Sequence, residues 1–150
     1  MLQDIFFLCA GFVFLLIETS WCGVLRFGLV QIDGLFPLVV WYSMRAPYLK
    51  GFFSIFSLGL LSFLFSFTSS YMIAFIISFL LIRFISSNIC KITLFGKMVF
   101  TGLITLLAMI IVMSISNYPE LIWPWAFLQA CLNFLLAPLF FYFFDKFETA

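Results

Sequence analysis

The stretch IAFIISFLLI, at residues 73–82, consists of apolar residues apart from a single serine, and it decides the fold. A strand of a membrane barrel alternates apolar and polar residues, and this stretch shows no such alternation. A helix satisfies its own backbone hydrogen bonds inside lipid, whereas an open strand does not. The stretch is therefore predicted to be a helix embedded in a membrane.

The rest of the chain has the same character, with 66% apolar and only 9% charged residues. An apolar run of about 18 residues or more is long enough to cross a bilayer. The predicted fold class is all-α: a polytopic membrane helix bundle that forms a single integral membrane domain over residues 1–150. Six transmembrane helices are expected, at residues 5–25, 32–48, 52–67, 71–90, 98–116 and 121–144.

The second and third stretches are short for complete spans. Arg45, Pro47, Lys50 and Gly51 separate them, which favours two short helices joined by a tight turn. A single re-entrant pair is the alternative.

The basic residues indicate the direction of the helices. With six spans, six of the seven basic residues fall on one side of the membrane and only Arg26 on the other. The positive-inside rule makes the richer side cytoplasmic, so both termini are expected in the cytoplasm. Tryptophan and tyrosine prefer the headgroup level, and Trp41 and Tyr42 are expected there, near the inner ends of their helix.

The composition argues against several classes of function. A net charge of +1 gives no footprint for nucleic acid. The chain has no histidine, and its four cysteines lack metal-ligand spacing. Asp145 and Glu148 are assigned to a solvated tail. We therefore expect no catalytic residue, no cofactor and no metal site, and a protein that is not an enzyme.

A few polar residues within the predicted spans are the candidate functional residues, because polar groups are costly in lipid. Glu18 and Arg83 are ionisable, and Arg83 is expected to extend toward the cytoplasmic headgroups. Gln129 and Asn133 lie one helical turn apart, so both are expected to face the bundle interior and bridge helices. Pro138 follows in the same stretch and is expected to kink its helix.

Four segments together resemble the rod shape-determining protein MreD family. ETS at residues 18–20 ends the first stretch, LVVWY at residues 38–42 follows a turn, and GLLS at residues 59–62 resembles a glycine-rich third helix. The most specific segment is QACLNFLLAPL at residues 129–139, which is similar to the closing helix of the family. Ser62 stands near the position where the family commonly has an acidic residue.

The resemblance implies a non-enzymatic subunit of the bacterial cell-elongation machinery, located in the inner (cytoplasmic) membrane. Its implied partners are membrane lipid, an MreC-like bitopic scaffold and, through that scaffold, MreB and peptidoglycan synthases.

A second hypothesis has the same length and number of spans. A substrate-binding membrane subunit of an energy-coupling-factor type transporter needs a pocket with several convergent polar groups. Glu18, Gln129 and Asn133 are the residues available for such a pocket.

Overall fold

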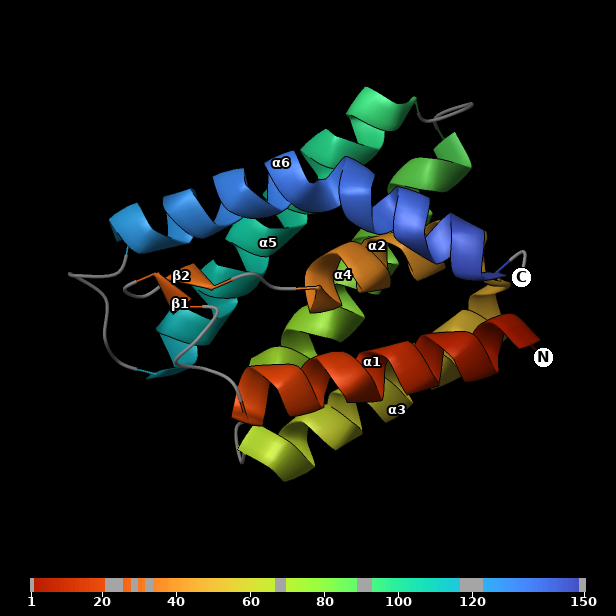
Figure 1. Ribbon diagram of the computed structural model, residues 1–150, viewed down its shortest axis with the longest axis horizontal. Helices are drawn as coiled ribbons and strands as arrows, with labels where there is room; N and C mark the ends of the chain where they lie inside the picture. The colour runs from red at the N-terminus through yellow and green to blue at the C-terminus, as the bar shows by residue number, and fades with distance from the viewer. Residues whose placement is uncertain are drawn as a thin grey trace.

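The computed structural model describes residues 2–20, 26–27, 30–31, 34–66, 70–88, 93–116 and 123–148. These residues form six helices, which pack as a bundle, and one pair of very short strands (Figure 1). The elements in chain order are α1 (Leu2–Ser20), β1 (Arg26–Phe27), β2 (Val30–Gln31), α2 (Leu35–Arg45), α3 (Tyr48–Ser66), α4 (Ser70–Asn88), α5 (Leu94–Ser116) and α6 (Trp123–Glu148).

Helix α2 is much shorter than its predicted span at residues 32–48. Its 11 residues make a helix of about 16 Å, because an α-helix rises about 1.5 Å per residue. The hydrocarbon core of a bilayer is about 30 Å thick. Helix α2 is therefore short, as expected, and has the length of a half-crossing, so six complete transmembrane helices are not confirmed. Helix α3, with 19 residues, is longer than the short helix expected there.

The connection before α2 contains the two strands. They pair antiparallel, with Arg26 opposite Gln31 and Phe27 opposite Val30. Helix α1 covers Leu2–Ser20, and the end of the predicted first span, at residues 21–25, lies outside the described residues. The other four helices overlap their predicted ranges and differ from them only at the ends.

Helix α2 lies in the centre of the bundle and contacts all five other helices. Every side chain from Leu35 to Ser43 is buried. A helix that is apolar on all sides is stable only when it is surrounded. Ser43 is the one polar residue in this run, and its hydroxyl donates to the Val39 carbonyl of the preceding turn at 2.6 Å.

Small residues allow the outer helices to approach closely. A Cβ atom at Gly59 of α3 would lie 3.1 Å from the Cα atom of Met72 in α4, so the two backbones nearly touch there. A Cβ atom at Gly11 of α1 would lie 2.5 Å from the Leu58 side chain of α3. Such close contacts at glycine are typical of membrane helices.

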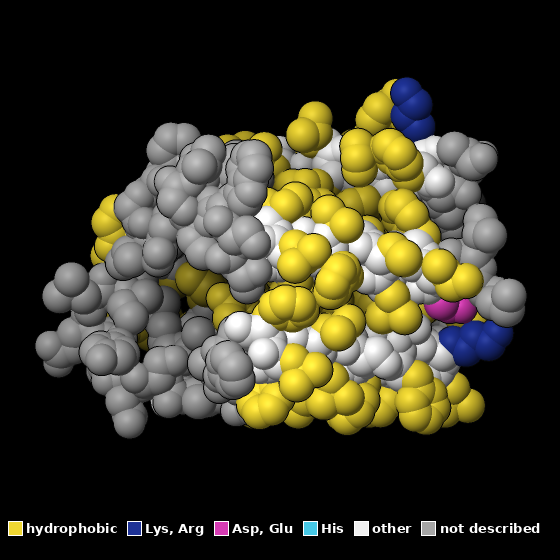
Figure 2. All heavy atoms as spheres, turned by 60° about the horizontal axis from the view of Figure 1, so that its bottom comes forward, with side chains coloured by type: hydrophobic (Ala, Val, Ile, Leu, Met, Phe, Trp, Pro, Cys, Tyr) yellow, Lys and Arg dark blue, Asp and Glu magenta, His cyan; other side chains and the backbone are white. Residues whose placement is uncertain are grey.

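One end of the bundle gathers the start of α1 and the end of α6 (Figure 1). Polar contacts join the end of α2 to both: Tyr42 to Asp4, and Trp41 to Asp145. We call this the terminal end. Figure 2 shows lysine, arginine and acidic side chains at this end, beside a broad apolar flank.

Among the described residues, three helices are long and apolar enough to cross a membrane: Tyr48–Phe65, Leu94–Ile111 and Trp123–Phe147. Two further apolar segments, Gln3–Ile17 and Tyr71–Ser86, are shorter.

Candidate functional site

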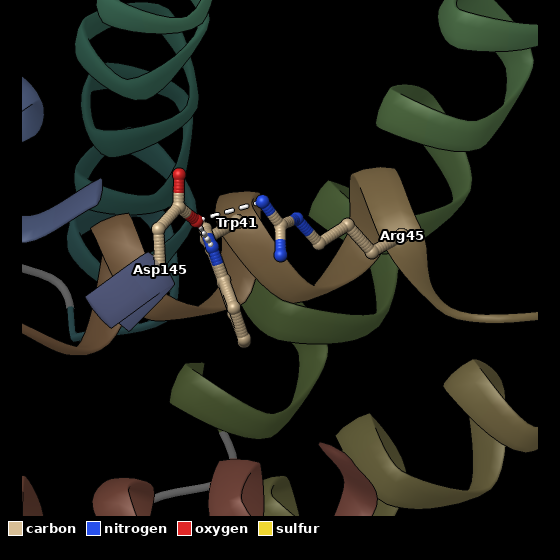
Figure 3. Close-up of polar contacts among 3 residues, drawn as sticks. All are labelled: Trp41, Arg45 and Asp145. Atoms are coloured by element: carbon tan, nitrogen blue, oxygen red, sulfur yellow. Dashed lines mark hydrogen bonds and ion pairs between the residues drawn. The ribbon is translucent and has the colours of Figure 1, made fainter. Parts of the chain in front are cut away.

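The last turn of α2 collects polar contacts from four other helices. Its first part is a cluster of Trp41, Arg45 and Asp145, drawn in Figure 3. The indole Nε1 of Trp41 donates to Asp145 Oδ1 of α6 at 2.6 Å, and Arg45 Nη2 donates to the same oxygen at 2.7 Å. The Arg45 guanidinium also lies over the Trp41 ring, 4.9 Å from its centre. One carboxylate oxygen thus ties the end of α2 to the end of α6.

The second part of the cluster centres on Tyr42. Its ring stacks on Phe7 of α1 with 3.9 Å between ring centres. Its hydroxyl donates to Asp4 Oδ1 of α1 at 2.5 Å and forms a hydrogen bond of 2.9 Å with Ser54 Oγ of α3. A phenol has one hydrogen to give, so Ser54 acts as the donor when Asp4 receives that hydrogen. Tyr42 thereby links three helices.

Arg83 of α4 provides the third part. Its Nη1 lies 3.5 Å from the Ser43 carbonyl oxygen, a long hydrogen bond. The carbonyl end of a helix carries partial negative charge, so a guanidinium at this position stabilises the end of α2. The expected contact of Arg83 with lipid headgroups stays a prediction.

A separate buried polar chain joins α5 and α6. The Thr105 hydroxyl donates to the Thr101 carbonyl at 2.8 Å and accepts from Asn133 Nδ2 at 3.0 Å. Asn133 Oδ1 in turn accepts from Gln129 Nε2 at 3.3 Å. The side chains of Asn133 and Gln129 are 0% and 3% exposed. Their predicted position in the bundle interior is confirmed, and Thr105 is the partner that the sequence did not indicate.

Glu18 and Pro138 are the two remaining candidate residues from the sequence. Glu18 belongs to α1, but its side chain lies outside the described residues. Pro138 lies inside α6, which continues to Glu148. Because proline has no N–H, the Phe134 carbonyl cannot receive the usual backbone bond there.

Three assignments made from the sequence need correction. Asp145 is part of helix α6 and binds Trp41 and Arg45, so it does not belong to a solvated tail. Trp41 and Tyr42 are 2% and 0% exposed, so they are core residues and not anchors at the headgroup level. The apolar pattern that continues through Phe143, Phe144 and Phe147 was the signal that α6 includes Asp145.

These arrangements are suited to holding helices together. Within the described part of the chain, no three histidine, cysteine, aspartate or glutamate residues are grouped as metal ligands. Comparisons with protein-family models, curated proteins and solved structures give no match to this chain.

Proposed function

We propose that the chain is a multi-pass protein of the bacterial inner membrane with both termini in the cytoplasm. The three long apolar helices and the apolar flank support the membrane placement. In this proposal α1, α3, α4, α5 and α6 cross the membrane. The connection before α2 and α2 itself together make the sixth crossing, with α2 in the half nearest the terminal end, so both termini lie on one side. The start of α2 supports that depth. A Cβ atom at Gly34, the N-cap residue of α2, would meet the side chain of Phe14, which lies inside α1, six residues before its last residue, Ser20.

The distribution of charge supports the orientation. Arg45, Lys50, Arg83, Lys97 and Lys146 belong to helix segments at the terminal end, whereas Arg26 lies in the connection at the other end. A cytoplasmic terminal end therefore satisfies the positive-inside rule.

Within the membrane, the proposed role is that of a non-enzymatic subunit of the cell-elongation machinery, which binds an MreC-like bitopic scaffold through its helices. The observation that carries this proposal is the segment at residues 129–139, which resembles the closing helix of the MreD family. Gln129 and Asn133 of that segment are buried against α5, while Leu135 and Leu139 are each 66% exposed. The segment thus has one face for its own bundle and another for the membrane or a partner.

The outer surface between α5 and α6 is the proposed contact for the transmembrane helix of the scaffold. A groove of about 220 Å³ lies there, between Gly102 and Leu103 of α5 and Phe127, Ala130 and Cys131 of α6. The lining includes the small residues Gly102 and Ala130, and small residues allow a second helix to approach closely.

The experiment is a pull-down in mild detergent, followed by identification of the co-purified proteins. Leu103→Trp fills the edge of the groove and should abolish recovery of the scaffold. Leu64→Trp on α3 is the matched control, because Leu64 and Leu103 are similarly exposed, at 64% and 58%. It should leave recovery unchanged. Loss of the scaffold in both variants, or in neither, would refute this contact surface.

The alternative function, a substrate-binding subunit of an energy-coupling-factor type transporter, is favoured by one observation. Gln129, Asn133 and Thr105 form a connected polar chain in the core, and such groups can orient a polar ligand. The transporter function requires that a small molecule raises the melting temperature of the wild type and that this rise is lost in Asn133→Ala. It also requires that the pull-down recovers no protein partner.

A further inference from the structure

A pocket at the terminal end lies where α2 and α4 end and α3 begins. It has a volume of about 410 Å³ and is lined by Met44, Tyr48, Leu80, Arg83, Phe84 and Ser86. We call it the Arg83 pocket. Its volume falls in the range of pockets that hold small ligands.

The polar groups of the pocket favour an anion. A guanidinium has five N–H donors, and among the described residues the guanidinium of Arg83 makes one long hydrogen bond, to the Ser43 carbonyl. Tyr48 adds a phenol, and Ser86 a hydroxyl that now donates to the Arg83 carbonyl at 3.3 Å. The residues that line the pocket include no aspartate or glutamate.

The start of α3 adds to this preference. The first backbone bond of this helix runs from Gly51 N–H to the Pro47 carbonyl, so the amides of Tyr48, Leu49 and Lys50 have no acceptor within the helix. Free amides and the helix dipole make the N-terminus of a helix favourable for negative charge. Tyr48, the first residue of α3, lines the pocket, and Lys50 lies in the same turn.

The remaining wall of the pocket is apolar and open to the outside. Met44 and Leu80 line it, and Phe84 is 70% exposed beside Arg83. Arg83 lies five residues before the end of α4 at Asn88, which is about 7.5 Å along the helix axis. A ligand that fits both walls has an anionic head at Arg83 and a hydrocarbon tail along Leu80 and Phe84.

From this geometry we propose that the Arg83 pocket binds the phosphate group of an anionic phospholipid in the cytoplasmic leaflet. Pockets with basic residues between membrane helices on this side hold such headgroups. The proposal rests on the membrane placement given above. It adds a defined lipid site, which neither the elongation role nor the transporter role requires.

Native mass spectrometry of the purified full chain tests the proposal, with phosphatidylglycerol and phosphatidylcholine as probes. The wild type should retain phosphatidylglycerol preferentially. Arg83→Gln should lower that retention about fivefold, the factor expected for one basic residue near an anionic lipid surface. Lys146→Gln is the matched control, because it removes the same charge at the terminal end outside the pocket, and it should keep the wild-type retention.

A second variant guards against a folding defect in Arg83→Gln. Ser86→Trp fills the pocket and leaves the guanidinium in place, so it should also lose the lipid while its melting temperature without lipid stays unchanged. A rise in melting temperature with millimolar inorganic phosphate alone, as large as the rise with phosphatidylglycerol, would overturn the assignment to a phospholipid. Equal losses in Arg83→Gln and Lys146→Gln would also overturn it, because retention would then follow total charge.

Extraction by alkaline carbonate separates this proposal from the membrane placement on which it rests. Release of the wild-type chain into the soluble fraction would contradict the placement itself. A chain that stays in the membrane but shows no preference for phosphatidylglycerol would contradict only the lipid site.

Discussion

Trp41 and Asp145 are separated by 104 positions in the chain, yet the indole of the first donates a 2.6 Å hydrogen bond to the carboxylate of the second. Trp41 is 2% exposed, and the Asp145 side chain is 46% exposed. The bond therefore joins a buried donor at the end of α2 to an acceptor at the surface of the terminal end. It is a direct link between the central half-helix and the last helix of the chain.

Trp41 and Arg45, which both bind Asp145, should differ in their energetic contributions. Asp145→Ala leaves the buried Trp41 N–H without its acceptor, which costs about 1–3 kcal/mol. Arg45→Gln removes an exposed ion pair and the guanidinium that lies over the Trp41 ring, and exposed contacts of these two kinds each contribute about 1 kcal/mol or less. Asp145→Asn keeps an acceptor oxygen and should behave like Arg45→Gln. Unfolding in mixed detergent micelles measures all three, and an Arg45→Gln variant as unstable as Asp145→Ala would contradict this ranking.

The buried chain between α5 and α6 should show coupling between its members. Gln129→Leu and Asn133→Leu are each expected to lower the stability in detergent modestly, because an interhelical hydrogen bond in a membrane protein contributes about 0.6 kcal/mol. Asn133 should have the larger effect, since it donates to Thr105 and accepts from Gln129.

A double-mutant cycle checks this coupling directly. Thr105→Val and Asn133→Leu remove the two ends of the same 3.0 Å bond, so their effects should not add. Strictly additive losses of stability would show that this hydrogen bond contributes nothing.

The packing around Gly59 of α3 and Gly102 of α5 predicts different effects for their substitution by alanine. A methyl group at Gly59 would meet the Met72 backbone at 3.1 Å, so Gly59→Ala should destabilise by about 1–3 kcal/mol through overpacking. At Gly102 the nearest atom is Phe134 Cβ, at 3.2 Å, and the nearest backbone atom is the Ala130 oxygen, at 3.4 Å. Gly102→Ala should be close to neutral, because alanine is also the better helix former. Thermal melting in detergent measures both, and equal losses would argue against a tight α3–α4 contact.

The proposed orientation is tested by labelling of single cysteines in a variant without the native ones. Cysteine at position 3 or 148 should react with an impermeant maleimide only after the membrane is opened, because both positions are placed in the cytoplasm. Cysteine at position 118 should react in intact cells. Labelling of position 3 or 148 from outside would contradict the orientation.

The sequence predicted the six helices, because long apolar runs separated by a few charges leave little choice in a membrane. It also placed Gln129 and Asn133 in the interior, since an amide in lipid needs a partner. It did not predict that α2 is enclosed by the other five helices. Residues 32–48 have the apolar composition of a span, and composition alone does not distinguish a crossing helix from a short one enclosed by five others.

The same limit explains the missed contacts at the terminal end. Asp4 and Asp145 lie at the two ends of the chain, where acidic residues are usually solvated. Their importance comes from Tyr42 and Trp41, which tertiary packing brings to them. No local pattern in the sequence joins residues so far apart, so only the packed bundle identifies these pairs.

The central claim is that this chain acts as a subunit that binds a protein partner through an exposed helix face. The most direct measurement is a mild-detergent pull-down combined with a screen for ligand-dependent melting shifts, performed on the wild type, Leu103→Trp and Asn133→Ala. The account predicts a bitopic scaffold protein with the wild type and with Asn133→Ala, its loss with Leu103→Trp, and no melting shift that depends on Asn133. A reproducible ligand shift that disappears in Asn133→Ala, with no protein partner recovered from the wild type, would contradict the account.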